Sequence, residues 1–295
     1  MGVVHHPGRR LRDTAHILAL ATCPYRSGMD AFNPLDAARC LWHHWQAGTA
    51  LDHLPMPLQP TTRAQGHAVQ ACLPEASGRA VLGWKIAATS QAGQAHINVG
   101  GPLPGRLLSG QVLAAGTPVP ASGNRMRVAE PEMAFRFGQA LAPRASAYRM
   151  DEVMAAVDSL HPSIEIPNSR FADFTAAGEA QLIADNACAH HFILGPASTT
   201  DWRALDLSQH PVHATVTRPD GRTWQRSGSG AAVLGDPRLA LTWLVNALSE
   251  LGVSLQPGQF VTTGTCMAPL AIEPGDQVLA DFGDLGQLSM HFGAA

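Results

Sequence analysis

The spacing of apolar residues predicts helices along the first half of the chain. Between Pro34 and Gly48 apolar side chains recur at helical intervals, with Asn33 as a cap and Pro34 in the first turn. The same periodicity predicts a second helix over 61–73 and a third over about 151–160. We therefore expect two helices near the N-terminus and one in the middle of the chain.

A fourth helix has the strongest start and stop signals. Asp236 is placed to cap it, Pro237 occupies its first turn, and Gly252 ends it. We interpret its apolar side chains as a packing stripe rather than a cofactor-binding motif: Leu239, Trp243, Leu244, Ala247, Leu248 and Leu251.

Beyond residue 80, short segments separated by glycine and proline predict strands. The clearest pair is a hairpin, in which residues 278–282 and 288–292 alternate inward on both sides of a turn at 283–286. The expected fold class is α+β. We expect a helical cap over residues 29–79 and a β-rich catalytic domain over 80–295, which together form one structural unit.

Acidic side chains interrupt one of these strands. In the stretch 128–137, Glu130 and Glu132 are two residues apart, so they project from one face at roughly 7 Å from each other. The apolar residues of the stretch are expected to enter the core from the other face: Met133, Phe135 and Phe137.

A third acid, Glu165, follows about thirty residues later between Ile164 and Ile166. The two isoleucines are expected to be buried, so Glu165 faces the opposite way. On spacing alone, solvent-facing glutamates on half-exposed strands are the commoner explanation. If the three acids converge, their repulsion requires a cation, and oxygen-only ligands favour Mg²⁺ first and Mn²⁺ second.

Composition indicates a globular protein with a small-molecule partner. The 295 residues are 45% hydrophobic and 15% charged, and the formal net charge is -3. No polybasic surface suits nucleic acid or an anionic membrane. The five cysteines are scattered and lack Cys-x-x-Cys spacing, so we expect reduced thiols, a cytoplasmic protein and no zinc cluster.

The N-terminal segment requires a separate interpretation. No apolar run approaches the roughly 18 residues of a membrane helix. A basic segment at 9–12 precedes a short apolar run over 15–23, which imitates a signal peptide without a clean cleavage site. We interpret residues 1–28 as an ill-ordered extension, or a strap on a neighbour, upstream of a functional start near Met29.

Lys85 lies in the stretch 83–90 among residues that are expected to be buried. Burial makes a lysine a usable acid or base near neutrality, whereas nearby carboxylates push its pKa the other way. Taken alone, a lysine whose stem packs and whose amine reaches solvent is the commoner case. Most of the histidines are interpreted as surface or packed residues, with His161 and His191 as outside candidates for the site.

Taken together, these stretches resemble the 2-keto-4-pentenoate hydratase and 4-oxalocrotonate decarboxylase family of the fumarylacetoacetate hydrolase superfamily. The resemblance covers about residues 34–295. Linked motifs carry it in the expected order: Gly83–Ser90, Ala129–Phe135, Ser163–Arg170, Ala184–Ala187 with Phe192–Gly195, and Gly230–Gly235 with Leu241–Leu244.

The resemblance implies a fumarylacetoacetate-hydrolase-like mixed β-sandwich or roll with flanking helices, usually oligomeric, that holds Mg²⁺ or Mn²⁺ on Glu130, Glu132 and Glu165. It implies short 2-keto or 2-hydroxydienoic acid substrates from the degradation of aromatic rings, whose carboxylate and 2-oxygen chelate the ion. Lys85 matches the family's active-site lysine and is the candidate for proton transfer. The implied substrate-binding positions are Ser169, Arg170, Cys188, Thr263 and Thr265.

This sequence departs from the family's pattern at two places. The family usually has an acidic residue shortly after the lysine strand, whereas residues 97–106 contain no acid, so an expected partner for Lys85 is missing. Cys188 stands where the family tends to have serine, which replaces a hydroxyl by a weaker donor. The expected metal ligands are untouched by either change.

We therefore expect a metal-dependent hydratase that converts a 2-hydroxy-2,4-dienoate to a 4-hydroxy-2-keto acid. The motifs do not separate this activity from that of a 4-oxalocrotonate-type decarboxylase. A carbon–carbon hydrolase would need a histidine with an orienting glutamate, and no such pair stands out near Lys85. A catalytically degenerate keto-acid-binding subunit, in complex with a related decarboxylase or hydratase, is the alternative from another class.

Overall fold

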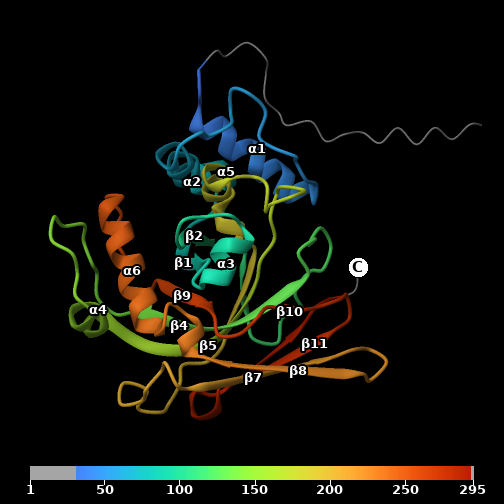
Figure 1. The fold of residues 1–295 in the computed structure, drawn as a ribbon, viewed down its shortest axis with the longest axis vertical. Coiled ribbons are helices and arrows are strands. Elements are labelled where there is room, and N and C mark those ends of the chain that lie inside the picture. The colour runs from blue at the N-terminus through green and yellow to red at the C-terminus, as the bar shows by residue number, and fades with distance from the viewer. Residues whose placement is uncertain (1–30, 294–295) are drawn as a thin grey trace, which may run out of the picture.

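The computed structural model describes residues 31–293, so the expectation for residues 1–28 lies outside the described residues. Two β-sheets lie below a group of helices (Figure 1). Most neighbouring strands of the larger sheet are antiparallel, but β1 pairs in parallel with β9, and β3 with β6. In spatial order its strands are β2 (Leu103–Leu108), β1 (Val81–Ala87), β9 (Phe260–Thr265), β4 (Val128–Phe137), β5 (Val157–Ile166), β6 (His191–Leu194) and β3 (Val112–Ala114), and β10 (Leu270–Ala271) pairs with β4.

The smaller sheet contains the predicted hairpin. Val278 stands opposite Met290 and Ala280 opposite Leu288, as the alternation of apolar residues predicted. The spatial order of the sheet is β12 (Gln287–His291), β11 (Gln277–Asp281), β7 (Pro211–Thr217) and β8 (Thr223–Ser229). The hairpin therefore forms one side of this sheet.

The main hydrophobic core lies on one face of β4. Met133, Phe135 and Phe137 are buried there with Val216 of β7 and Leu244 of a helix, α6 (Pro237–Glu250). This is the face on which the sequence placed the three apolar side chains. The core thus joins the larger sheet to the smaller sheet and to α6.

The other face of β4 lies inside a curl of the larger sheet. Ala134 packs there with Leu107 of β2 and Phe192 of β6, although these strands are well separated in the order of the sheet. Glu130 and Glu132 share this inner face with Ala134, because alternate residues of a strand point the same way. The acidic side chains therefore enter an enclosed part of the fold.

The helices α1 (Pro34–Ala47), α2 (Arg63–Ser77) and α5 (Glu179–Ala184) stand together above the larger sheet (Figure 1). Their apolar side chains form a second core, which includes Leu41, Val69 and Leu182. Because α5 comes from the middle of the chain, the N-terminal helices are joined to the β-rich part by shared packing. The remaining short elements are α3 (Gln91–His96), α4 (Met150–Ala156) and the 3₁₀ turns η1 (Asn186–Cys188), η2 (Gly230–Ala232) and η3 (Gly283–Leu285).

Two helix predictions need correction. The third predicted helix is wrong in its second half, because the chain leaves α4 after Ala156 and enters β5, which pairs with β4 from Phe137 back to Glu130. The second predicted helix was expected to stop at residue 73, but α2 continues through Pro74 and ends at Gly78 in the left-handed region.

The apolar stripe of α6 was also predicted incorrectly in part. Leu239 and Leu251 are 46% and 41% exposed, whereas Leu241 and Val245 are buried with Leu244. The buried face is therefore rotated around the helix from the expected one, because the packing of neighbouring elements decides which face is covered.

Two further expectations concern the cysteines and membranes. Cys72, Cys188 and Cys266 have free thiols, but Cys40 is disulfide-bonded, so the expectation of reduced thiols is wrong for Cys40. Within residues 31–293, no helix has both the length and the apolarity that crossing a bilayer requires.

Candidate metal and substrate site

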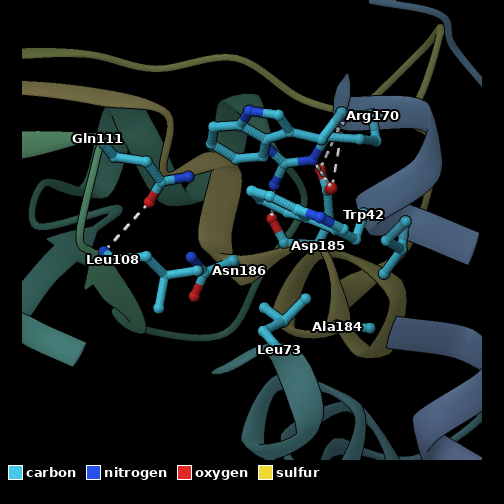
Figure 2. Close-up of a pocket in the computed structure, with 10 residues that line it drawn as sticks. Trp42, Leu73, Leu108, Gln111, Arg170, Ala184, Asp185 and Asn186 are labelled. Atoms are coloured by element: carbon cyan, nitrogen blue, oxygen red, sulfur yellow. Dashed lines mark hydrogen bonds and ion pairs between the residues drawn. The ribbon is translucent and has the colours of Figure 1, made fainter. Parts of the chain in front are cut away.

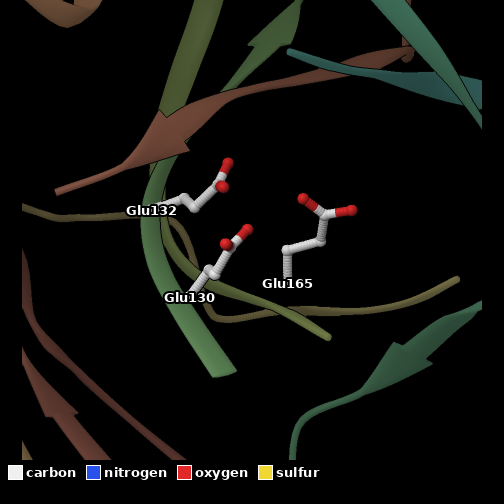
Figure 3. A group of neighbouring side chains, drawn as sticks. All are labelled: Glu130, Glu132 and Glu165. Carbon is white, nitrogen blue, oxygen red and sulfur yellow. The ribbon is translucent and has the colours of Figure 1, made fainter. Parts of the chain in front are cut away.

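Glu130 and Glu132 on β4 and Glu165 on β5 direct their carboxylates at one another (Figure 3). Glu130 stands directly opposite Glu165 in the antiparallel register, and one oxygen of each of the three side chains lies within 4.8 Å of the others. Glu132 and Glu165 are buried, and Glu130 is half-buried. The three acids therefore converge, and solvent exposure does not explain the two buried ones.

The two buried carboxylates have different partners. Glu132 Oε2 accepts hydrogen bonds from the Thr262 hydroxyl and, at 2.9 Å, from the Gly264 N–H. Glu165 Oε2 forms an ion pair with Lys85 Nζ at 3.0 Å, but neither oxygen of Glu165 receives an aligned hydrogen bond from residues 31–293. Glu165 thus has unused acceptor capacity in a buried place, as a metal ligand would.

Burial raises the pKa of all three carboxyl groups, and repulsion adds to it for Glu130 and Glu132. Desolvation is the largest cause for Glu130, repulsion by Glu165 adds to it, and together they raise the pKa of Glu130 to about 7 against the attraction of Lys85. Desolvation also raises the pKa of Glu132 and of Glu165. One lysine cation cannot neutralise three carboxylates, so the cluster fits a divalent cation, which would stabilise the ionised forms.

Lys85 is the only lysine in the 295-residue chain. It lies on β1, is buried, and donates a hydrogen bond from Nζ to the carbonyl oxygen of Ala187 at 3.0 Å. Burial alone would lower its pKa, but the carboxylates of Glu165, Glu130 and Glu132 raise the pKa above its ordinary value. Lys85 is therefore a buried cation beside the carboxylates.

The segment that lacks the expected acid, residues 97–106, places a glycine opposite the lysine. Gly105 of β2 pairs with Lys85 of β1 in the antiparallel register. The acidic and polar partners of Lys85 come from other segments, namely Glu165 of β5 and the Ala187 carbonyl of η1.

Cys188 is the last residue of the same turn, η1. Its side chain is buried, and burial, followed by repulsion from Asp185, raises the pKa of the thiol to about 12. At neutral pH it is therefore an uncharged thiol. Its role in substrate binding stays a prediction.

Ser169 and Arg170 meet Asp185 at the end of α5. Figure 2 shows Arg170 and Asp185 together. The Ser169 hydroxyl donates to Asp185 Oδ2 at 2.6 Å, and the Arg170 guanidinium forms a buried ion pair with the same carboxylate. Arg170 also stacks on Trp45, with its guanidinium carbon 4.5 Å from the ring centroid.

The remaining guanidinium contacts of Arg170 are with main-chain oxygens. Its Nη1 donates to the carbonyls of Asn168 at 2.8 Å and Ala189 at 3.0 Å, and its Nη2 donates to the carbonyl of Asp185. Arg170 lines a cavity together with Trp42 and Asn186 (Figure 2). Its guanidinium is thus already held by protein groups, and binding of a substrate carboxylate by Arg170 stays a prediction.

The two threonines predicted to bind substrate lie on β9. Thr263 is buried and donates to the Met133 carbonyl at 2.9 Å, so its hydroxyl joins β9 to β4. Thr265 is half-buried, stands opposite Glu132, and donates to the Met267 carbonyl at 2.9 Å. Of the two, Thr265 lies nearer to solvent.

The outside candidates His161 and His191 are not members of the acidic cluster. The ring nitrogens of His161 are hydrogen-bonded with Ser159 and with the Gly195 carbonyl, both at 2.9 Å. The ring of His191 contacts that of His190 at a centroid distance of 4.2 Å.

Sequence reasoning missed Thr262, Gly264 and Ala187. Thr262 and Gly264 lie two residues apart and both contact Glu132, so the period of a strand could have identified them once β9 was placed beside β4. The carbonyl of Ala187 has no sequence signal, because every residue has a main-chain oxygen.

The sequence of this chain is similar to those of known proteins. Residues 106–292 match the family described as fumarylacetoacetate (FAA) hydrolase C-terminal. The chain is 29% identical to the 2-keto-4-pentenoate hydratase of Paraburkholderia xenovorans LB400 over 260 residues, which is 87% of this chain and 94% of the relative.

Two decarboxylases are also similar. The chain is 31% identical to the 4-oxalocrotonate decarboxylase of Pseudomonas sp. CF600 over 220 residues, covering 74% of this chain and 80% of that enzyme. The solved structure of 4-oxalocrotonate decarboxylase from Pseudomonas putida G7, complexed with magnesium and adipate, superimposes with a TM-score of 0.75 at 26% identity, covering 88% of this chain and 97% of that chain.

Proposed function

Because the chain belongs to the fumarylacetoacetate hydrolase family, we propose that it is a metal-dependent hydratase of a short 2-hydroxy-2,4-dienoate in aromatic catabolism. The product would be a 4-hydroxy-2-keto acid. The observation that carries this proposal is the convergence of three carboxylates within 4.8 Å beside a single buried lysine. The hydratase from P. xenovorans, which matches 87% of this chain, supports the choice of reaction.

Glu130, Glu132 and Glu165 are proposed to hold a divalent ion, with Mg²⁺ favoured by the all-oxygen ligand set. Such an ion supplies Lewis acidity toward the carboxylate and 2-oxygen of a 2-keto or 2-hydroxy acid. The P. putida decarboxylase structure contains magnesium and a dicarboxylate, adipate, which supports this assignment. The hydrogen bonds from Thr262 and Gly264 favour the ionised form of Glu132 and would orient its carboxylate for this task.

Lys85 is proposed to transfer protons during the hydration. In the overall reaction the oxygen of water ends on C4, while C3 and C5 each gain a hydrogen and the 2-hydroxyl loses its proton as the ketone forms. A buried ammonium that is held by Glu165 and the Ala187 carbonyl can deliver and recover a proton while it is shielded from bulk water. Thr265 and Cys188 are proposed to contact the substrate.

Decarboxylation of a 4-oxalocrotonate-type acid is the second candidate. The match to two 4-oxalocrotonate decarboxylases, one of them over 97% of its solved chain, favours this reading. The same carboxylates and lysine would serve both reactions, because each moves a proton along a conjugated keto acid. A keto-acid-binding subunit without turnover of its own is the third reading.

The cellular setting belongs to the same proposal. We expect a cytoplasmic homo-oligomer, and a complex with a related decarboxylase or hydratase subunit is included in the third reading. Size-exclusion chromatography with light scattering measures the oligomeric state. Activity that appears only after a partner is added would support the third reading.

The test is the loss of ultraviolet absorbance of 2-hydroxypenta-2,4-dienoate on mixing with the protein and Mg²⁺. We expect bleaching that EDTA abolishes and that Glu132→Ala loses, while Glu250→Ala, at the exposed end of α6, retains it. If the dienoate stays intact but 4-oxalocrotonate releases CO₂, the decarboxylase reading replaces the hydratase reading.

A further inference from the structure

The turn η1 has an unusual backbone. Asn186, Ala187 and Cys188 are three consecutive non-glycine residues with positive φ, at 58°, 52° and 60°. Left-handed conformations of non-glycine residues occur as single residues far more often than in a row, because the side chain crowds the backbone. A run of three persists only where the surroundings hold it in place, and such runs concentrate at functional sites.

The side chain of Asn186 holds this turn against β2. Its Oδ1 accepts from the Arg106 N–H at 2.6 Å, and its Nδ2 donates to the Arg106 carbonyl at 2.8 Å. The amide therefore pairs with both polar groups of one residue, as a neighbouring strand would. Asparagine also tolerates the left-handed conformation better than most residues.

The residue beside this clamp is Gly105, which stands opposite Lys85. A Cβ atom at Gly105 would come within 2.6 Å of the Asn186 carbonyl oxygen and within 2.9 Å of Lys85 Cγ and Cδ. The missing side chain thus leaves the space through which the lysine stem passes. The turn and the lysine stem are packed against the same glycine.

The Ala187 carbonyl completes the arrangement, because the left-handed turn directs it at Lys85 Nζ, 3.0 Å away. The lysine amine is therefore fixed by one main-chain acceptor on η1 and one carboxylate on β5. If the turn relaxed toward ordinary backbone angles, this acceptor would move away from Lys85.

We propose that Asn186 and Gly105 are positioning residues for Lys85: the Asn186 clamp on Arg106 holds the strained turn, and the turn holds the lysine amine beside Glu165. The inference rests on the proposed function in one respect, since it names what positions the proposed proton-transfer group. A purely structural role for Asn186 would change stability without changing Lys85.

The test uses the fact that Lys85 is the only lysine. Protein labelled with ¹³C-lysine gives one lysine Cε signal in an NMR spectrum, so the environment of Lys85 can be followed without assignment. In Asn186→Gly the backbone can keep its left-handed conformation, because glycine has no Cβ, but the clamp is lost. We expect the Lys85 signal of this variant to shift and broaden in the presence of Mg²⁺.

A matched control exists elsewhere in the chain. Asn246 on α6 makes the same two-bond clamp on Tyr148, accepting from its N–H at 2.7 Å and donating to its carbonyl at 3.1 Å. Asn246→Ala removes a comparable clamp and should lower thermal stability without moving the Lys85 signal.

The kinetic expectation follows from the position of the amine. In Asn186→Gly we expect kcat to fall about 10- to 100-fold, with KM and the Mg²⁺ dissociation constant changed by no more than about threefold, because only the proton-transfer group is displaced. Gly105→Ala disturbs the same packing from the other side and should shift the Lys85 signal even if Asn186→Gly folds poorly.

The inference is overturned if the Lys85 signal in folded Asn186→Gly or Gly105→Ala coincides with that of the wild type. It is also overturned if Asn246→Ala moves the signal as much as Asn186→Gly. If the wild type does not hydrate the dienoate but the signal still responds as expected, the proposed function fails and the positioning inference stands.

Discussion

The ammonium of Lys85 neutralises part of the negative charge of the carboxylate cluster, which would otherwise attract a metal ion. Its ammonium pairs with Glu165 at 3.0 Å, and Glu165 is one of three converging carboxylates. In the low-dielectric interior a cation this close weakens the attraction of the cluster for a second cation. Lys85 and the proposed metal ion would therefore share the charge of Glu165.

We expect Lys85→Met to bind Mg²⁺ more tightly than the wild type at pH 8, since one opposing charge is removed. Its kcat should fall by about 10²- to 10⁴-fold, the range that general acid–base catalysis supplies. Titration calorimetry measures the affinity, and the absorbance assay measures kcat. Lys85→Arg keeps the charge and should lose activity with little change in Mg²⁺ affinity. Weaker Mg²⁺ binding by Lys85→Met would contradict the charge argument.

Thr262 is expected to orient Glu132 as a metal ligand. Its hydroxyl donates to Glu132 Oε2. Among the described residues, the Gly264 N–H is the one other donor to this oxygen. Thr262→Val should weaken Mg²⁺ binding by about 10- to 100-fold, because partners of metal ligands have effects of this size. Thr262→Ser retains the hydroxyl and should stay close to the wild type in the same calorimetric titration. Equal affinities for the valine and serine variants would show that the hydrogen bond does not matter.

At the scale of elements, the end of α5 is held by a buried ion pair. Asp185 receives hydrogen bonds from Ser169 and Arg170, and both members of the ion pair are almost fully buried. This pair ties the segment after β5 to the helix that precedes η1. Its loss would therefore loosen the segment that leads into the strained turn.

We expect Asp185→Ala to lower the free energy of unfolding by about 3–5 kcal/mol, because Arg170 is left as a buried charge without its partner. Urea unfolding followed by circular dichroism measures this value. Asp220→Ala removes an exposed pair with Arg222 and should cost at most about 1 kcal/mol. If the two variants lose similar stability, the buried ion pair does not hold the end of α5.

Elements with local signals were predicted well, and elements defined by distant pairing were not. The hairpin around residues 283–286 has both its alternation and its turn within a few residues of each other. Residues 157–160 were assigned to a helix, because the strand they form depends on pairing with β4, which lies about twenty residues earlier. The packing of neighbouring elements likewise decided which face of α6 is buried.

The candidate site was predictable where the chemistry lies in side chains. The convergence of Glu130, Glu132 and Glu165 followed from strand alternation together with the family resemblance. The Ala187 carbonyl and the left-handed turn could not be predicted, because backbone angles at non-glycine residues have little sequence signature beyond Asn186 itself.

At the scale of the whole molecule, buried histidines should make stability depend on pH. His190 is buried near Arg170 and Arg125, and within the described part of the chain neither of its ring nitrogens has a hydrogen-bond partner. Burial, then repulsion by His191 and these arginines, lowers the pKa of His190. Burial lowers the pKa of His191 to about 4, with a smaller contribution from Arg79.

The sign of the effect follows from proton binding. Between pH 4 and 6.5 the unfolded chain protonates His191 more readily than the folded chain does, so this residue destabilises the fold as the pH falls through that window. The acidic cluster acts in the opposite direction, since the raised pKa of Glu130 favours proton uptake by the folded state. The contribution of His191 is therefore isolated by comparison with a variant.

We expect the wild type to lose about 1–3 kcal/mol more stability than His191→Gln when the pH is lowered from 6.5 to 4.5. Urea unfolding at the two pH values, with EDTA present to remove metal ions, measures the difference. The same loss in both proteins would mean that His191 titrates normally in the folded state.

The single lysine has a consequence for how the fold can be monitored. A protease that cuts only after lysine has one peptide bond to attack in the entire chain, between Lys85 and Ile86, and that bond lies in the buried strand β1. Cleavage requires β1 to leave its neighbours β2 and β9. Two fragments of fixed size would therefore appear only when this sheet opens. Limited proteolysis after Lys85 thus reports the opening of the sheet around the candidate site.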